Sequence, residues 1–101
     1  MAAGAKSLAD RGPGGLNLLS ATQAAKKIAA GETTSLALVE DCLARIAARE
    51  PDIRAWAFVD PEIARRQARA RDQEPSRSAF HGLPVGIKDI FDTFDMPTAY
   101  G

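Results

Sequence analysis

The sequence has very few of the residues that build disulfides and metal sites. Cys42 is its one cysteine and His81 its one histidine in 101 residues. A single cysteine excludes an internal disulfide, which suits a reducing compartment. Cys42 and His81 match no recognised metal-ligand spacing. We interpret Cys42 as a small, buried or half-buried side chain of a helix and His81 as a loop histidine.

A net charge and a long hydrophobic run are also missing. Thirteen Lys and Arg residues balance thirteen Asp and Glu residues, so nothing in the overall charge favours nucleic acid or an acidic membrane as partner. The stretch "MAAGAKSLADRGPGG" has no apolar core like that of a signal peptide, and no run approaches membrane-spanning length. We therefore predict a cytoplasmic protein with no nucleic-acid partner and no membrane partner.

One local cluster of arginines could point to a phosphate contact, but no aromatic residues are interleaved with it. A solvated helical face is the favoured interpretation. The cluster comprises Arg65, Arg66, Arg69, Arg71 and Arg77.

Three helices are predicted after a flexible arm of residues 1–17. Ser20 followed by Gln23 is a capping-box pattern that starts a helix, and Gly31 is placed to end it. A second helix begins after Thr34 or Ser35, carries an apolar stripe with spacings of 3, 4 and 3, and should end at Pro51. The third helix follows Asp60-Pro61 and reaches about Gln73.

Two segments look like strands. "AWAFV" at residues 55–59 is apolar on both faces, and "LPVGIKDIF" at residues 83–91 has a similar character. Two strands do not make a stable sheet by themselves. We therefore predict an α/β fold in which the sheet contains more strands than this chain provides.

Lys88 directly follows the apolar run Leu83–Ile87, and the role of a charged residue at this place needs an explanation. A lysine in a strand usually faces solvent or lies at a sheet edge. By strand alternation Lys88 shares a face with Gly86 and Ile90, a face with no clear contact with water. A desolvated lysine gives up its proton more easily and can then act as a base.

The order of residues around Lys88 is more specific. The stretch "GLPVGIKDIFDTFDMPTAYG" resembles the catalytic-lysine segment of the amidase signature family, and "LALVEDCLARIAARE" with "AWAFVD" is similar to the family's N-terminal part. The resemblance covers about residues 18–101. Asp95 departs from it, because many members have glycine there. The matching residues are Gly82, Pro84, Lys88, Asp89, Thr93, Pro97, Thr98 and Gly101.

The resemblance implies a mixed sheet flanked by helices and a hydrolase that cleaves carbon–nitrogen bonds of amides, with a small-molecule amide as substrate. It implies a Ser–cisSer–Lys mechanism in which Lys88 is the catalytic base, with no metal and no organic cofactor. Residues 18–101 would be the N-terminal part of a truncated amidase domain. None of the serines lies in a Gly-Ser-Ser-Gly context, so we expect this chain alone to be inactive.

Two alternatives stay open at this point. The amidase subunit of a glutamine-dependent tRNA amidotransferase resembles the family over the same stretch. A non-enzymatic remnant or interaction module would keep the start of the fold without its chemistry. The sequence indicates neither the amide substrate nor the oligomeric state.

Overall fold

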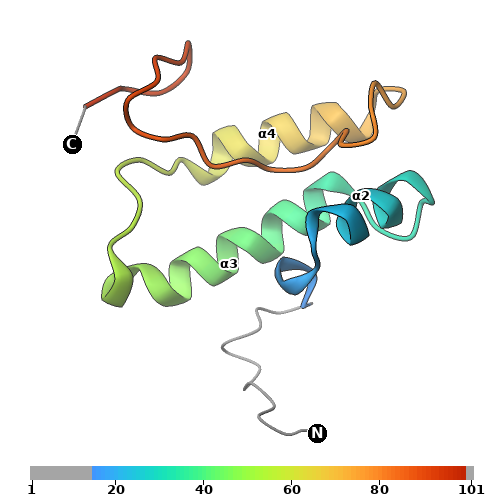
Figure 1. Cartoon of the computed structure of the whole chain (residues 1–101), viewed down its shortest axis with the longest axis horizontal. Coiled ribbons are helices and arrows are strands. Elements are labelled where there is room, and N and C mark those ends of the chain that lie inside the picture. The colour runs from blue at the N-terminus through green and yellow to red at the C-terminus, as the bar shows by residue number, and fades with distance from the viewer. Residues whose placement is uncertain (1–14, 100–101) are drawn as a thin grey trace, which may run out of the picture.

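The computed structural model describes residues 15–99, and this part of the chain is helical with long irregular connections (Figure 1). A short 3-10 helix, η1, spans Leu16–Leu18, and the α-helices α2, α3 and α4 span Ala21–Ala29, Ser35–Ile53 and Pro61–Asp72. The three predicted helices are therefore confirmed. The arm predicted for residues 1–17 falls mostly outside the described residues, apart from the start of η1.

Side chains at the helix starts explain why the helices begin where they do. Ser20 and Gln23 form the predicted capping box at α2, in which each side chain accepts a hydrogen bond from the other residue's backbone N–H. Thr34 caps α3. At α4, the Asp60 carboxylate accepts bonds from the first turn and Pro61 takes the first helical position.

The predicted end of α3 at Pro51 is wrong, because the helix continues to Ile53. A proline this close to the end removes one backbone hydrogen bond and leaves the preceding turns intact. Arg54 then ends the helix in the left-handed conformation, with φ of 53°. The Glu50 carboxylate accepts hydrogen bonds from the backbone N–H groups of Ala55 and Trp56, at 2.9 and 2.8 Å, and so holds the chain that leaves the helix.

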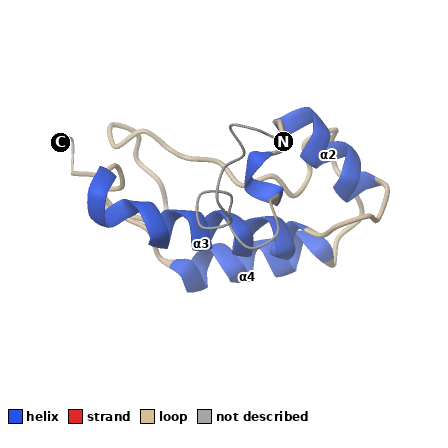
Figure 2. Cartoon of the chain, turned by 90° about the horizontal axis from the view of Figure 1, so that it is seen from below, coloured by secondary structure: helices blue, strands red, loops and turns tan. Residues whose placement is uncertain are grey.

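Helices α3 and α4 pack side by side and α2 lies across one end of α3 (Figures 1 and 2). The buried apolar residues come from all three helices, and most of them are small. They are Ala24, Ala25, Leu38, Val39 and Ala68. Alanine side chains bury little area, so this core contributes only modestly to the free energy of folding.

The two predicted strands do not form in residues 15–99. Residues 55–59 and 83–91 contain no strand. The described part of the chain is therefore helical, and the sheet of the predicted α/β fold is not seen in it. The physical reason is the one that limits any isolated strand pair: an extended backbone needs neighbouring strands for its N–H and C=O groups. A helix completes these bonds within itself.

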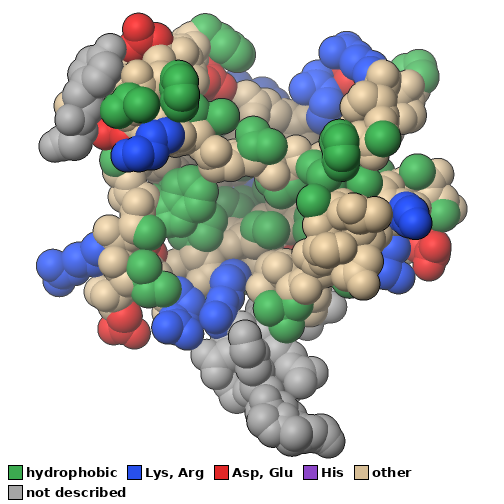
Figure 3. Space-filling model, viewed as in Figure 1, with side chains coloured by type: hydrophobic (Ala, Val, Ile, Leu, Met, Phe, Trp, Pro, Cys, Tyr) green, Lys and Arg blue, Asp and Glu red, His purple; other side chains and the backbone are tan. Residues whose placement is uncertain are grey.

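We call residues 82–99 the lysine segment. It runs back from the N-terminal end of α3 past α4 toward the connection between α3 and α4 (Figure 1). Most of its large apolar side chains are exposed, Val85 and Phe94 most of all. On the face seen in Figure 3, hydrophobic side chains surround a central hollow.

Candidate functional site

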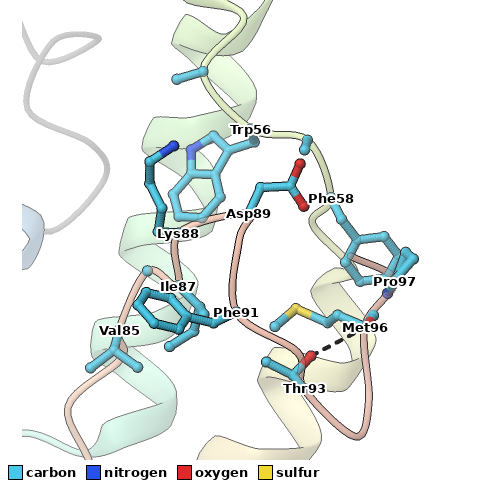
Figure 4. Close-up of a pocket in the computed structure, with 13 residues that line it drawn as sticks. Trp56, Phe58, Val85, Ile87, Lys88, Asp89, Phe91, Thr93, Met96 and Pro97 are labelled. Carbon is cyan, nitrogen blue, oxygen red and sulfur yellow. Dashed lines mark hydrogen bonds between the residues drawn. The ribbon is translucent and has the colours of Figure 1, made fainter. Parts of the chain in front are cut away.

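A pocket of about 560 Å³ lies between the lysine segment and the connection from α3 to α4 (Figure 4). Lys88, Asp89, Thr93 and Pro97, four of the residues that match the amidase motif, line it. The rest of its wall is mostly apolar. These further lining residues are Ala55, Trp56, Ala57, Phe58, Val85, Gly86, Ile87, Phe91 and Met96.

Trp56 lies against the backbone of the lysine segment at Gly86. A β-carbon placed on Gly86 would lie 3.4 Å from Cη2 of the indole. The two segments predicted to be strands therefore do lie close together, although they form no ladder. The sequence indicated that both are apolar, but nothing in it indicated this pairing of one glycine with one indole.

Lys88 lies beside Trp56 at the pocket and is exposed to solvent (Figure 4). The covered face expected from strand alternation is therefore absent in the described part of the chain. Lys88 and Asp89 point in different directions in Figure 4, as expected for neighbouring residues of an extended segment.

The other matching polar residues shape the loop after Lys88. Asp89 accepts a hydrogen bond from the backbone N–H of Ala99 at 2.9 Å, which closes the loop at its base. The Thr98 hydroxyl donates to the carbonyl of Phe91 at 3.0 Å, and the Thr93 hydroxyl donates to that of Met96 at 3.3 Å. Asp89, Thr93 and Thr98 thus hold the loop that follows Lys88, a role that the sequence pattern alone did not indicate.

Asp95, the departure from the family pattern, connects the loop to a helix. Its carboxylate accepts a hydrogen bond from the side-chain amide of Gln67 on α4, at 2.8 Å. A glycine at this position would lack that bond. The departure therefore bears on how the loop is attached to α4.

The surroundings of Cys42 and His81 indicate structural roles for both residues. Burial, with a smaller contribution from the Asp41 carboxylate, raises the pKa of the half-buried Cys42 thiol, which disfavours the nucleophilic thiolate. Both ring nitrogens of His81 form hydrogen bonds with backbone atoms. Nε2 lies 2.8 Å from the carbonyl oxygen of Arg71, and Nδ1 lies 3.4 Å from the backbone nitrogen of Arg77. His81 therefore anchors the loop that leads into the lysine segment.

Two other kinds of feature are absent from residues 15–99. This range contains no group of three or more His, Cys, Asp and Glu side chains placed to hold a metal ion. None of its helices has the length and apolar character needed to cross a membrane.

Comparison with known proteins places the chain in a family. A family profile described as Amidase matches residues 37–101. The chain belongs to the amidase signature family. The match takes in most of α3, all of α4 and the whole lysine segment, so the motif around Lys88 lies within the matched range. Gly101, the last residue of the motif, lies outside the described residues.

Individual relatives carry two kinds of name. A glutamyl-tRNA(Gln) amidotransferase subunit from Chloroflexus aggregans is 44% identical over 90 residues, which cover 85% of this chain and 18% of the relative. The protein of the same name from Streptomyces coelicolor is 41% identical over 87 residues, or 82% of this chain and 18% of the relative. The "Putative amidase AmiD" of Mycobacterium tuberculosis is 38% identical over 90 residues, or 85% of this chain and 19% of the relative.

The chain spans less than one fifth of the length of these curated relatives. No solved structure matches it. Support for the amidase-type mixed sheet therefore comes from family membership, while the structure supplies the helices and the arrangement of the lysine segment.

Proposed function

We propose that this chain provides the catalytic-lysine segment of an amidase-type hydrolase, with Lys88 as the base. The observation that carries the proposal is that Lys88, Asp89, Thr93 and Pro97 line one pocket. Asp89 and Thr93 bond within the loop, whereas Lys88 lies at the pocket beside Trp56.

The chemistry expected of Lys88 is removal of a proton during amide cleavage. A serine hydroxyl is weakly nucleophilic until a base takes its proton, and Ser–Lys pairs do this without histidine. In the Ser–cisSer–Lys mechanism the second serine relays the proton to the lysine. Lys88 must be neutral for this step, because only an unprotonated amine can accept the proton.

The test joins this segment to the serine-containing part of the amidase domain and follows ammonia release from simple aliphatic and aromatic amides. Lys88→Ala and Lys88→Arg should both lower kcat by more than ~100-fold, the lower end for a general base, because arginine does not deprotonate usefully. Lys26→Ala is the matched control, since Lys26 is an exposed lysine on α2. A folded Lys88→Arg enzyme with near-normal turnover would remove Lys88 from the mechanism.

The 101-residue chain by itself should release no ammonia from the same amides. Its serines are not in a Gly-Ser-Ser-Gly context, so the proposal gives it a base without a nucleophile. Turnover that copurifies with the chain and disappears in Lys88→Ala would contradict this expectation.

The second candidate is the amidase subunit of a glutamine-dependent tRNA amidotransferase. The names of the relatives from Chloroflexus aggregans and Streptomyces coelicolor favour this candidate. The two candidates share the role of Lys88 and differ in substrate, so ammonia release from glutamine and from simple amides separates them. A strong preference for glutamine supports the amidotransferase candidate, and a preference for simple amides supports a free-standing amidase.

A further inference from the structure

A buried serine joins α3 to the start of the lysine segment. Ser35 is the first residue of α3 and is 2% exposed. Its hydroxyl donates a hydrogen bond of 2.6 Å to the carbonyl oxygen of Gly82, 47 residues further along the chain. This bond is not part of the helix cap, because the capping side chain of α3 belongs to Thr34.

The same serine is held from the other side by the end of α4. The Asp72 carboxylate accepts hydrogen bonds from the backbone N–H groups of Ser35 and Leu36, at 2.7 and 3.0 Å. A carboxylate at a helix N-terminus satisfies free N–H groups and interacts favourably with the helix dipole. Asp72 therefore links the first residue of α3 to the last turn of α4. The hydroxyl of Ser35 in turn links this junction to Gly82.

Gly82 has little room for a side chain at this junction. Its φ is +89°, a conformation that favours glycine. A β-carbon there would lie 3.2 Å from Cβ of Ser35 and 3.6 Å from Cδ1 of Ile28. Because His81, the preceding residue, bonds to the carbonyl of Arg71, the chain is attached to the helices at two consecutive residues before it turns into the lysine segment.

We propose that Ser35 and Asp72 are positioning residues for Lys88. The inference rests on the proposed function of Lys88 as the base. In residues 15–99 the lysine segment has no strand neighbour, so its path before Lys88 depends on the bond at Gly82 and on the contact of Gly86 with Trp56. A base must be held within a fraction of an ångström of its productive place, and the Ser35–Gly82 bond restrains the chain that carries it.

Trp56 gives a readout that does not need enzyme activity. It is the only tryptophan of the chain, it contacts Gly86, and the Glu50 carboxylate anchors its backbone independently of Ser35. We would compare tryptophan emission and acrylamide quenching of the 101-residue chain with Ser35→Ala and Thr34→Ala variants. Thr34→Ala is the matched control, because it removes the neighbouring hydroxyl and its cap but no bond to Gly82.

Ser35→Ala should shift the emission to longer wavelength and increase the quenching constant, because the lysine segment moves away from the indole. Thr34→Ala should leave both unchanged at a temperature where the helical circular dichroism of the chain is retained. If Ser35→Ala behaves like Thr34→Ala, the proposal is overturned. Should Ser35→Ala fail to fold, Asp72→Asn decides by the same measurement: it keeps the Ser35 hydroxyl and weakens its anchor, and a smaller change in the same direction is expected, whereas no change overturns the proposal.

The kinetic arm uses the joined enzyme described above. Ser35→Ala should lower kcat by up to ~100-fold, the loss expected when a reacting group is displaced by about 1 Å, with KM unchanged, while Thr34→Ala keeps normal kcat. Equal kcat values for these two variants would reduce Ser35 to a structural role. Failure of the proposed function gives a different result: Lys88→Ala would then keep its activity, while the tryptophan measurement still reports whether Ser35 holds the segment.

Discussion

The helices and the lysine segment differ in how far their apolar side chains are exposed to solvent. Leu38 on α3 is 5% exposed, whereas Val85 in the lysine segment is 77% exposed and Phe94 is 96% exposed. Both regions are rich in apolar residues. The difference lies in what each region needs from the rest of the chain before it can bury that surface.

Helices become complete at short range. Their backbone hydrogen bonds close within four residues, and one partner helix is enough to cover an apolar stripe. The lysine segment has the apolar, extended character of a sheet strand, and a strand buries its two faces only between other layers. In residues 15–99 the helices therefore pack against one another, while a few polar bonds and the contact of Trp56 with Gly86 hold the lysine segment.

The largest expected effect is the loss of stability when a buried apolar side chain of the helices is shortened. The same kind of change in the lysine segment should have almost no effect, so the pair separates the two regions most clearly. Leu38→Ala is expected to destabilise the chain by about 2 to 5 kcal/mol, the usual cost of deleting a buried leucine side chain. Val85→Ala should change the stability by less than about 0.5 kcal/mol, as for surface substitutions. Urea denaturation followed by far-ultraviolet circular dichroism measures both, and equal losses would show that the lysine segment buries Val85 in solution.

Two glycines test the junction between the regions. Gly31 and Gly82 both have positive φ, at 76° and 89°, but a β-carbon on Gly31 would meet no atom within 4 Å, whereas one on Gly82 would crowd Ser35. Gly31→Ala should therefore cost about 1 to 2 kcal/mol from the left-handed conformation alone. Gly82→Ala should cost more, in the same denaturation experiment. A smaller loss for Gly82→Ala than for Gly31→Ala would mean that the Ser35–Gly82 contact is loose.

The smallest effect concerns an ion-pair group after α4. Glu74 bonds to Arg71 at 2.7 Å and to Arg77 at 2.9 Å. These arginines, the Arg71 hydrogen bond above all, hold the pKa of the Glu74 carboxyl below its ordinary value. A carboxyl group whose pKa is lowered by folding stabilises the folded state above its unfolded pKa, and this contribution is lost as the pH falls through the folded value.

Glu74→Gln should therefore lower the melting temperature slightly at neutral pH, and the two melting temperatures should converge under acidic conditions. Thermal unfolding of both proteins across this pH range is the measurement. Glu62→Gln is the control, because it also removes one carboxylate. Glu62 lies in the first turn of α4, is exposed, and pairs with Arg65 and not with Arg71 or Arg77. A difference that grows toward acidic pH would contradict the assigned ion pairs.

Local signals predicted the local structure well. The capping box at Ser20 and the Asp60-Pro61 start are confirmed because their partners lie within three residues. The α3 end was misplaced at Pro51, since the Glu50 bonds that support the last turn cannot be recognised from a proline rule. The strands at 55–59 and 83–91 were predicted from composition, but a strand depends on neighbours that the composition does not contain.

The candidate site divides along the same line. The order of Gly82, Lys88 and Asp89 indicated the family from sequence, and the comparisons confirm that family. The role of Lys88 as a base stays a prediction. The contact of Trp56 with Gly86 and the bond from Ser35 to Gly82 join residues far apart in the sequence, and no pattern along the chain predicted them.

The sequence by itself determined where the three helices start, which residue types surround Lys88, and to which family the chain belongs. These properties depend on neighbours within a few positions or on the order of residues, both of which are written in the chain. Only the tertiary structure decided that Ser35, Asp72 and Gly82 meet, that Asp89 closes a loop with Ala99, and that Lys88 is exposed beside Trp56. The physical reason is that hydrogen bonds and packing across distant segments depend on how the helices are placed in space, which local propensity leaves open.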